Sequence, residues 1–229
     1  MVQIIGRKEV SYGIFLFEYE DGKKVLATKN LVPGKTVYDE KLIKYEGVEY
    51  RTWSPYRSKL AAAILNGLKH VPINEGFKVL YLGIASGTTA SHISDIIGKK
   101  GIIYGIEFSQ RPIRDLLKVA EIRKNIAPLL KDARLPHEYS YIAESVDLIY
   151  EDIAQPFQSE ILIKNVRMFL KNSGEALIAI KARSIDVTKP PEQVFEEQKK
   201  VIEDEGLKVV EEVRLDPYSK DHIMFRIKY

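Results

Sequence analysis

The chain has 229 residues, 45% of them hydrophobic and 29% charged, which is enough apolar content for a packed core and excludes disorder as the dominant state. Thirty-five basic and 32 acidic residues give a formal net charge of +3, which permits nucleic-acid binding without requiring it. No cysteine is present, which excludes disulfides, thiolate zinc sites and cysteine nucleophiles.

The sequence shows no recognisable targeting signal. The chain shows no apolar segment long enough for a signal peptide or a membrane span, and no cluster of residues predicts a metal site. The lack of cysteine suits a reducing compartment. We therefore expect a cytoplasmic protein without membrane contact.

The first 52 residues read as β structure. Aromatic and β-branched residues form short runs, separated by turn signals such as Asp21-Gly22 and Glu46-Gly47. The predicted strands are Ile14–Glu20, Val25–Thr28, Leu42–Tyr45 and Val48–Arg51. We predict a small antiparallel β domain over residues 1–52.

A second domain is predicted over residues 53–229, beginning with a helix. Ser54 is placed to cap that helix and Pro55 to occupy its first position. Apolar residues then recur at helical spacing as far as Pro72, at Leu60, Ile64, Leu65 and Leu68.

Beyond residue 77, short apolar strands alternate with helical stretches. The predicted strands are Val79–Leu82, Ile102–Ile106, Ala127–Leu130, Val146–Tyr150, Ala176–Ala182, Val209–Leu215 and Ile223–Ile227. Such alternation indicates an α/β fold with a mostly parallel seven-stranded sheet covered by helices. Residues 216–221 are too few for a crossover helix, so the last two strands should form an antiparallel hairpin. This Rossmann-like combination is typical of class I methyltransferases.

The loop after the first strand of the predicted sheet has the features of a cofactor site. Gly83, Ala85 and Gly87 allow close backbone approach to a ligand, and Thr88 and Thr89 begin the next helix. A helix N-terminus offers free N–H groups and a partial positive charge. The small residues do not follow the Gly-x-Gly-x-x-Gly spacing of dinucleotide-binding loops, because Thr88 stands where the third glycine would be.

Acidic residues follow the next three strands. Glu107 is placed to accept hydrogen bonds from both hydroxyls of a ribose, and Asp132 to accept one from an adenine amino group. Asp152 follows the fourth strand. Their neighbours Phe108, Ala133 and Gln155 complete the predicted cofactor-binding set. Either NAD or S-adenosylmethionine would satisfy these groups.

Six motifs together resemble the fibrillarin family, in its archaeal form, over essentially the whole chain. They are Thr52–Leu60, Tyr81–His92, Tyr104–Ser109, Glu151–Pro156, Ile180–Asp186 and Pro217–His222. Family members commonly have Asn where this chain has Ser54. Both residues cap helices, so the difference changes little.

The resemblance implies a function and a set of partners. The function is methyl transfer from S-adenosylmethionine to ribose 2′-hydroxyls of rRNA or tRNA, within a ribonucleoprotein. The implied partners are a box C/D guide RNA with its target RNA, a scaffold protein of the Nop family, and a kink-turn-binding protein of the ribosomal type.

The resemblance also implies a catalytic set, Lys59, Asp152, Lys181 and His222. A 2′-hydroxyl is a weak nucleophile, so attack on a sulfonium methyl needs in-line placement and removal or stabilisation of the hydroxyl proton. We expect Lys181 to accept that proton or to orient the hydroxyl. Asp152 should hold the lysine and steer the cofactor, and His222 should position the ribose or its phosphate.

Two other functions fit parts of the sequence. The cofactor loop with Glu107 also suits a nicotinamide-dependent oxidoreductase, although the loop spacing and the C-terminal hairpin speak against it. A structural RNA-binding subunit without activity would keep the fold, but the intact catalytic set argues against that.

Overall fold

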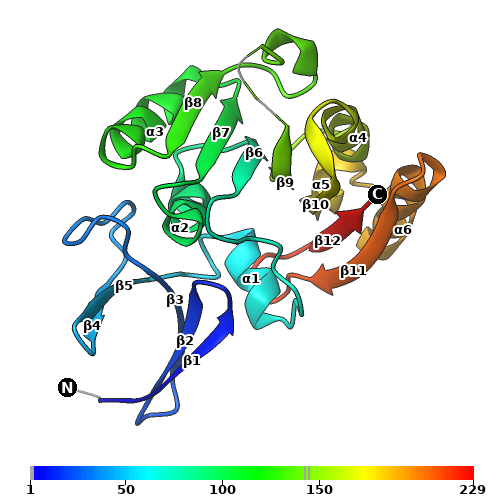
Figure 1. Cartoon of the computed structure of the whole chain (residues 1–229). Coiled ribbons are helices and arrows are strands. Elements are labelled where there is room, and N and C mark those ends of the chain that lie inside the picture. The colour runs from blue at the N-terminus through cyan, green and yellow to red at the C-terminus, as the bar shows by residue number, and fades with distance from the viewer. Residues whose placement is uncertain (1–2, 142, 144) are drawn as a thin grey trace.

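Two β-sheets form the framework of the molecule (Figure 1). The computed structural model describes residues 3–141, 143 and 145–229, so residues 1 and 2 of the N-terminal domain predicted over 1–52 lie outside the described residues. The N-terminal residues form the first sheet, and the rest of the chain forms the second. No helix in the described ranges is long and apolar enough to span a membrane.

The smaller sheet, as far as the chain is described, has five antiparallel strands in the order β1-β2-β3-β5-β4. Their bounds are β1 (Ile4–Ser11), β2 (Ile14–Tyr19), β3 (Lys24–Lys29), β4 (Leu42–Tyr45) and β5 (Val48–Thr52). The sequence pattern predicts the last four and misses β1. This edge strand is mostly exposed and carries charged residues, so it lacks the apolar alternation of a half-buried strand.

The larger sheet has seven described strands in the order β11-β12-β10-β9-β6-β7-β8. Their bounds are β6 (Lys78–Leu82), β7 (Ile102–Glu107), β8 (Ile126–Leu130), β9 (Val146–Glu151), β10 (Leu170–Lys181), β11 (Lys208–Arg214) and β12 (His222–Lys228). Strands β6 to β10 pair in parallel, whereas β12 is antiparallel to both β10 and β11. The predicted parallel sheet with a C-terminal antiparallel hairpin is confirmed.

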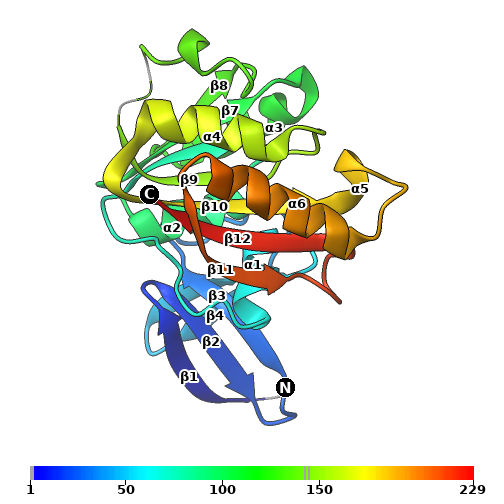
Figure 2. The same ribbon diagram turned by 90° about the vertical axis from the view of Figure 1, so that its right-hand side faces the viewer.

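Helices cover both faces of this sheet (Figure 2). Alternate strand residues pack on α1 (Lys59–Leu65), α2 (Thr88–Ile97) and α3 (Gln110–Ile122) on one face. The residues between them pack on α4 (Gln158–Phe169) and α6 (Pro191–Asp204) on the other face. The 3₁₀-helix η1 (Pro136–Glu138) and the short α5 (Ala182–Ile185) lie in connecting segments. The alternation follows from the two-residue period of a strand, and both faces are buried.

The predicted start of the first helix is wrong. Helix α1 begins at Lys59, and its N-cap is Ser58, whose side chain accepts a hydrogen bond from the Ala61 N–H. Ser54 belongs to a turn instead, because its carbonyl accepts from the N–H of Arg57. Both serines have cap chemistry, and only tertiary contacts distinguish them.

The ends of two predicted elements also move. Helix α1 ends at Leu65, with Asn66 as its C-cap and Gly67 following at a φ of +101°, so Leu68 packs in the core from outside the helix. A glycine with positive φ commonly ends a helix. Strand β10 ends at Lys181, and Ala182 begins α5.

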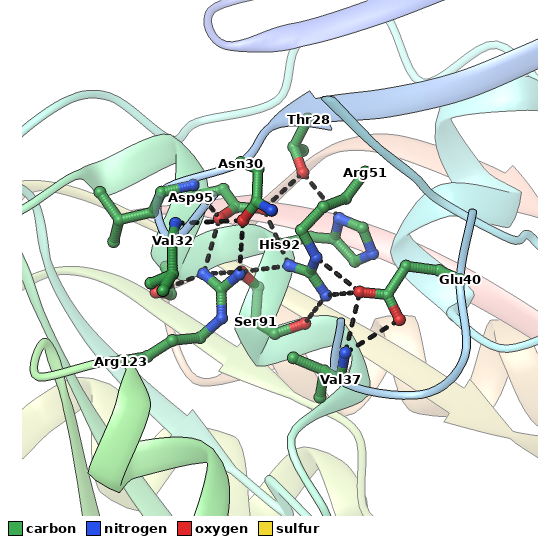
Figure 3. Close-up of polar contacts among 12 residues, drawn as sticks. Thr28, Asn30, Val32, Val37, Glu40, Arg51, Ser91, His92, Asp95 and Arg123 are labelled. Atoms are coloured by element: carbon green, nitrogen blue, oxygen red, sulfur yellow. Dashed lines mark hydrogen bonds and ion pairs between the residues drawn. The ribbon is translucent and has the colours of Figure 1, made fainter. Parts of the chain in front are cut away.

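A buried cluster of charges joins the smaller sheet to α2 and α3 (Figure 3). Arg51 on β5 contacts the carboxylate of Glu40 at 2.5 Å and that of Asp95 on α2 at 2.8 Å. Arg123, which follows α3, contacts the other oxygen of Asp95 at 2.6 Å. All four side chains are essentially buried, and two arginines face two carboxylates. Because removal of one charge would leave its partners buried and uncompensated, the cluster restricts how the two sheets dock.

Beside the charge cluster, His92 of α2 forms further contacts with the N-terminal residues. Each nitrogen of the His92 ring forms one hydrogen bond. Thr28 Oγ1 lies 2.8 Å from Nδ1, and the Tyr38 hydroxyl lies 2.7 Å from Nε2. The ring stacks on Trp53 at a centroid distance of 4.6 Å. Burial, and then the two nearby arginines, lower the pKa of His92 well below its usual value, so the ring is neutral.

Substitution Asp95→Asn should destabilise the protein by about 3 kcal/mol, because two buried guanidinium groups would lose their shared counter-charge. Chemical denaturation at pH 7 measures the change. Asp115→Asn is the matched control, since Asp115 forms an exposed pair with Lys118, and it should leave stability unaltered. Equal stability of the two variants would show that the cluster does not hold the sheets together.

Candidate functional site

Two adjoining pockets open where the parallel strands of the larger sheet end. The first, the strand-end pocket, has a volume of about 300 Å³ and is lined from the loops after β6, β7, β8 and β9. The second, the lysine pocket, has a volume of about 430 Å³ and is lined by residues of α1, β10 and β12 together with the loop after β6. Both include Gly83, Ala85 and Asp152, so the pockets adjoin at the loops after β6 and β9.

Every residue of the predicted cofactor-binding set lines one of these pockets, whereas Gly87 of the same loop lines neither and packs against Leu116 instead. Thr88 and Thr89 line the lysine pocket. The others line the strand-end pocket: Gly83, Ala85, Glu107, Phe108, Asp132, Ala133, Asp152 and Gln155. The gathering follows from the fold, because the carboxyl ends of neighbouring parallel strands lie at the same edge of a sheet.

The loop from β6 to α2 depends on Gly83. Its φ is +77°, and a Cβ at this position would lie 2.5 Å from the carbonyl oxygen of Asp152. The residue therefore admits close approach of the loop after β9, whereas the sequence suggests close approach of a ligand. Gly87 caps α2 in the left-handed conformation, at a φ of +90°.

The Glu107 carboxylate is held in place by two backbone groups. One oxygen accepts a hydrogen bond from the N–H of Ala85 at 3.1 Å, and the other accepts from the N–H of Ser109 at 2.8 Å. The side chain is nearly buried at the end of β7. An ionised carboxylate offers about four lone-pair sites, so it retains acceptor capacity for two further hydroxyl groups.

The Asp132 carboxylate has a partner of its own. Arg134 donates to it from Nε at 2.9 Å and from Nη2 at 2.6 Å. Hydrogen bonds from Arg134 lower the pKa of Asp132 below its usual value. The residue lines the strand-end pocket, as predicted from its position after β8, but its acceptor capacity is shared with this arginine.

A hydrogen bond between two hydroxyl groups links the start of α1, which carries Lys59, to the first turn of α2. Thr89 in the first turn of α2 donates from Oγ1 to the hydroxyl of Ser58 at 2.9 Å. Ser58 in turn caps α1, of which Lys59 is the first residue. This contact explains why Ser58 is the cap, and it gives Thr89 a structural role beside any contact with a ligand.

Lys59 and Asp152 form an ion pair at the mouth of the lysine pocket. The ammonium group of Lys59 lies 2.7 Å and 3.0 Å from the two carboxylate oxygens of Asp152. Both side chains are about a quarter exposed. The pair joins α1 to the loop after β9, although the residues are 93 positions apart.

Lys181 reaches the same pocket from the end of β10. Its backbone is held by Gln158, which accepts a hydrogen bond from the Lys181 N–H at 3.0 Å and donates to its carbonyl at 3.5 Å. No hydrogen bond or ion pair of the Lys181 ammonium is found within the described ranges. The amine is therefore available to a ligand in the lysine pocket.

His222 completes the set from the first position of β12. Its Nδ1 lies 2.6 Å from the carbonyl oxygen of Lys220, and because a carbonyl only accepts, Nδ1 carries the proton. Burial, opposed by this hydrogen bond and reinforced by Lys59, lowers the pKa of His222. The neutral ring leaves the Nε2 lone pair as an acceptor, and the ring lines the lysine pocket.

Two residues next to the predicted catalytic set, Gln158 and Glu151, were given no role by the sequence analysis. Gln158 orients Lys181, but the residues are 23 positions apart and nothing local connects them. Glu151 directly precedes Asp152, is fully buried, and has no hydrogen-bond partner for either carboxylate oxygen among the described residues. Burial, and then Asp152 and Glu160, raise the pKa of Glu151 well above its usual value. Its position at the end of an apolar strand is the sequence signal for such a shift.

The chain is similar to known proteins over nearly its whole length. The family model described as fibrillarin matches residues 5–229. A protein of Thermococcus onnurineus named fibrillarin-like rRNA/tRNA 2′-O-methyltransferase is 56% identical over 216 residues, which are 94% of this chain and 95% of that protein.

Two solved structures share the fold. Aeropyrum pernix fibrillarin, in complex with natively bound S-adenosyl-L-methionine, is 51% identical with a TM-score of 0.91, covering 99% of this chain and 100% of that one. A chain of a fibrillarin/Nop5p complex is 46% identical with a TM-score of 0.85, covering 96% and 99%. Both likenesses therefore extend over the two sheets of this chain.

Substitution Glu151→Gln should stabilise the protein, and the gain should grow with pH. A raised folded-state pKa means that the unfolded state loses its proton first, so the wild-type protein loses stability as pH rises above about 4.3, the pKa of an unperturbed glutamate. The neutral amide avoids this loss. Denaturant titrations at pH 4.5 and pH 8 measure it, and an equal difference between the two proteins at both values would contradict the prediction.

Proposed function

The chain belongs to the fibrillarin family, and on this premise we propose that it transfers a methyl group from S-adenosylmethionine to ribose 2′-hydroxyls of rRNA and tRNA. The observation that carries the proposal is the lysine pocket, where Lys59, Asp152, Lys181 and His222 converge from four separate elements beside the strand-end pocket. Methyl transfer needs a cofactor site and proton-handling groups next to each other, and the adjoining of the two pockets at this edge of the sheet supports the proposal.

The residues of the strand-end pocket fit S-adenosylmethionine. When bound, this cofactor supplies a methyl group activated by a sulfonium charge. Glu107 has free acceptor sites for the ribose hydroxyls, and the exposed Phe108 ring offers an apolar surface beside the same pocket. Asp152 lines both pockets, so its carboxylate would hold the sulfonium-bearing end of the cofactor.

The residues of the lysine pocket have separate roles in the methyl transfer. Lys59 holds the Asp152 carboxylate through its bidentate contact. Lys181, whose backbone Gln158 orients, takes up the proton of the 2′-hydroxyl in its neutral amine form and becomes an ammonium group. His222 is neutral, and its Nε2 accepts a hydrogen bond from the ribose, which positions the hydroxyl.

The chain works as the catalytic subunit of a ribonucleoprotein in this proposal. The likeness to the fibrillarin of a fibrillarin/Nop5p complex supports a Nop-type scaffold as partner. A box C/D guide RNA would select the target nucleotide by base pairing, and a kink-turn-binding protein would complete the particle. The modest net charge of +3 agrees with RNA binding that relies on such partners.

Two measurements separate this function from its rivals. Equilibrium binding of S-adenosylhomocysteine should be tight and should not be displaced by NADH, whereas a nicotinamide-dependent oxidoreductase would show the opposite preference. Transfer of a tritiated methyl group to target RNA, in the particle assembled with guide RNA, scaffold and kink-turn-binding protein, distinguishes an enzyme from an inactive RNA-binding subunit.

Substitution Glu107→Ala should raise the Kd for S-adenosylhomocysteine by about 100-fold or more, since it removes two hydrogen bonds to a charged group that each contribute about 1.5–3 kcal/mol. Isothermal titration calorimetry measures the change. Glu121→Ala, an exposed acid on α3, is the matched control and should bind like the wild type. An unaltered Kd for Glu107→Ala would remove the strand-end pocket as the cofactor site.

Substitution Lys181→Ala should lower methyl transfer by about 100-fold or more, the usual contribution of a positioned acid or base. Affinity for S-adenosylhomocysteine should stay within about twofold, because the wild-type amine acts on the RNA hydroxyl. The assay is methyl transfer in the assembled particle, with Lys164→Ala on the exposed face of α4 as control. Full activity of Lys181→Ala would exclude its role in proton transfer.

A further inference from the structure

A third cavity, here called the basic notch, adjoins the lysine pocket. Its volume is about 340 Å³. The lining comes from the segment between β3 and β4, from α3, from the turn before α1 and from the loop between β6 and α2. Three residues, Arg57, Ser86 and Thr88, line both the notch and the lysine pocket. The two cavities therefore meet at the start of α2, beside the place where the proposed reaction occurs.

Arg57 is the one cation lining the lysine pocket to which the proposed reaction gives no role. Lys59 is held by Asp152, and Lys181 takes up the proton. The Arg57 side chain is exposed, and no carboxylate partner of its guanidinium is found within the described ranges. Its charge is therefore available to an anion at the border of the two cavities.

The segment between β3 and β4 holds the guanidinium of Arg57 through Tyr38. The guanidinium carbon lies over the Tyr38 ring, 5.4 Å from its centroid. The Tyr38 hydroxyl is fixed in turn, 3.2 Å from the carbonyl oxygen of Thr52 and 2.7 Å from Nε2 of His92. A guanidinium stacked on a ring uses its face and keeps its in-plane N–H groups free to donate. Such a fork matches two oxygens of one phosphate group.

Positive charge predominates among the side chains that line the notch. A single acid, Asp115, stands against four basic residues, which are Lys35, Arg57, Lys118 and Arg123. Arg123 belongs to the buried charge cluster, and Lys118 has an exposed contact of 3.0 Å with Asp115, which contributes little. In the part of the chain that the structure describes, the exposed Lys35 ammonium has no hydrogen bond or ion pair. Lys35 and Arg57 are therefore the two cations open to a ligand.

The position of the notch favours the RNA backbone as its ligand. The target ribose enters the neighbouring lysine pocket, and the phosphates next to this ribose are the anions that come closest to the notch. A base-paired strand turns its bases toward the guide and its phosphates outward, so a protein contacts the phosphates without opening a base pair. An acidic peptide would satisfy the two charges, but nothing in the notch would place it beside the target ribose.

We propose that the basic notch binds phosphate groups of the target strand next to the nucleotide that is methylated, while that strand stays base-paired to the guide RNA. Arg57 donates to one phosphate through its fork, and Lys35 contacts a neighbouring phosphate. The inference rests on the proposed function, because the lysine pocket is where the target ribose enters. It also gives the smaller sheet a function, because Lys35 and Tyr38 belong to the segment between its strands β3 and β4.

The contacts in the notch should govern the docking of the RNA duplex rather than the capture of the target. Base pairing with the guide holds the target in the particle, so docking onto the catalytic subunit is an intramolecular step. Loss of these contacts should therefore lower the rate of methyl transfer at saturating target RNA, and the Kd of the particle for its target should stay within about twofold.

The main test is removal of both charges in the assembled particle. Arg57→Ala with Lys35→Ala changes the notch. Lys99→Ala with Lys208→Ala is the matched control, since both control lysines are exposed at the opposite edge of the larger sheet and line none of the three cavities. At 0.15 M salt the notch variant should lower the single-turnover rate by about tenfold, and the salt dependence of that rate should fall by about two counterions. The control variant should match the wild type.

Binding of S-adenosylhomocysteine should be equal in the wild type, the notch variant and the control variant. Arg57 also lines the lysine pocket, so a direct contact with the carboxylate of the cofactor is the competing assignment. A raised Kd for S-adenosylhomocysteine in Arg57→Ala alone would overturn the notch as a phosphate site and assign this arginine to the cofactor.

Ethylation of phosphates by ethylnitrosourea locates the contact on the RNA. In the wild-type particle, target-strand phosphates beside the target nucleotide should be protected from ethylation, and in the Arg57→Ala particle the same phosphates should react. The guide RNA, labelled in a parallel reaction, should show no change between the two particles. A change confined to guide-strand phosphates would overturn the assignment to the target strand.

The outcomes separate the inference from the proposed function. Wild-type rate and salt dependence in the notch variant, or target-strand phosphates that react freely in the wild-type particle, would overturn the notch assignment while methyl transfer persists. Loss of scaffold binding by the notch variant in size-exclusion chromatography would also overturn it and assign the notch to a protein partner. Protected phosphates in a wild-type particle without methyl transfer would uphold the notch and overturn the enzymatic proposal.

Discussion

The parallel direction of the strands in the larger sheet is the constraint on which the candidate site depends. Strands β6, β7, β9 and β10 all end at one edge, because the helices that connect them return the chain to the opposite edge each time. Residues from widely separated parts of the sequence therefore meet there, Glu107 and Asp152 among them. The antiparallel strand β12 starts at the same edge, and this is what brings His222 beside Lys181.

The smaller sheet helps to place Lys59 at that edge of the larger sheet, because the chain segment after β5 leads directly into α1. After β5 the chain passes Trp53, whose ring stacks on His92 of α2, and then enters α1 at Lys59. The buried charges of Arg51, Asp95 and their partners hold this docking, and each must be compensated because none is hydrated. The position of Lys59 thus depends on contacts made well away from the lysine pocket.

Charge is distributed unevenly within the site. Lys59 is committed to Asp152, whereas Lys181 faces the pocket with no such counter-ion found among the described residues. His222 is uncharged, because burial and the neighbouring ammonium groups oppose its protonation. The pocket consequently offers a ligand one neutral acceptor and one lysine side chain without a counter-ion among the described residues, which suits a reaction in which a hydroxyl must be positioned and then lose its proton.

By itself, the sequence determined the strands of the parallel sheet, the C-terminal hairpin, the loop around Gly83 and the family, because these depend on local periodicity, turn residues and contiguous motifs. It did not determine β1, whose exposed charged residues carry no apolar period, or the cap of α1, where Ser54 and Ser58 have equal local chemistry. Tertiary structure decided these, together with the contact of Gln158 with Lys181 and the burial of Glu151 without a hydrogen-bond partner among the described residues. The physical reason is that burial and hydrogen bonding between distant residues arise only when the layers pack, and no local pattern records them.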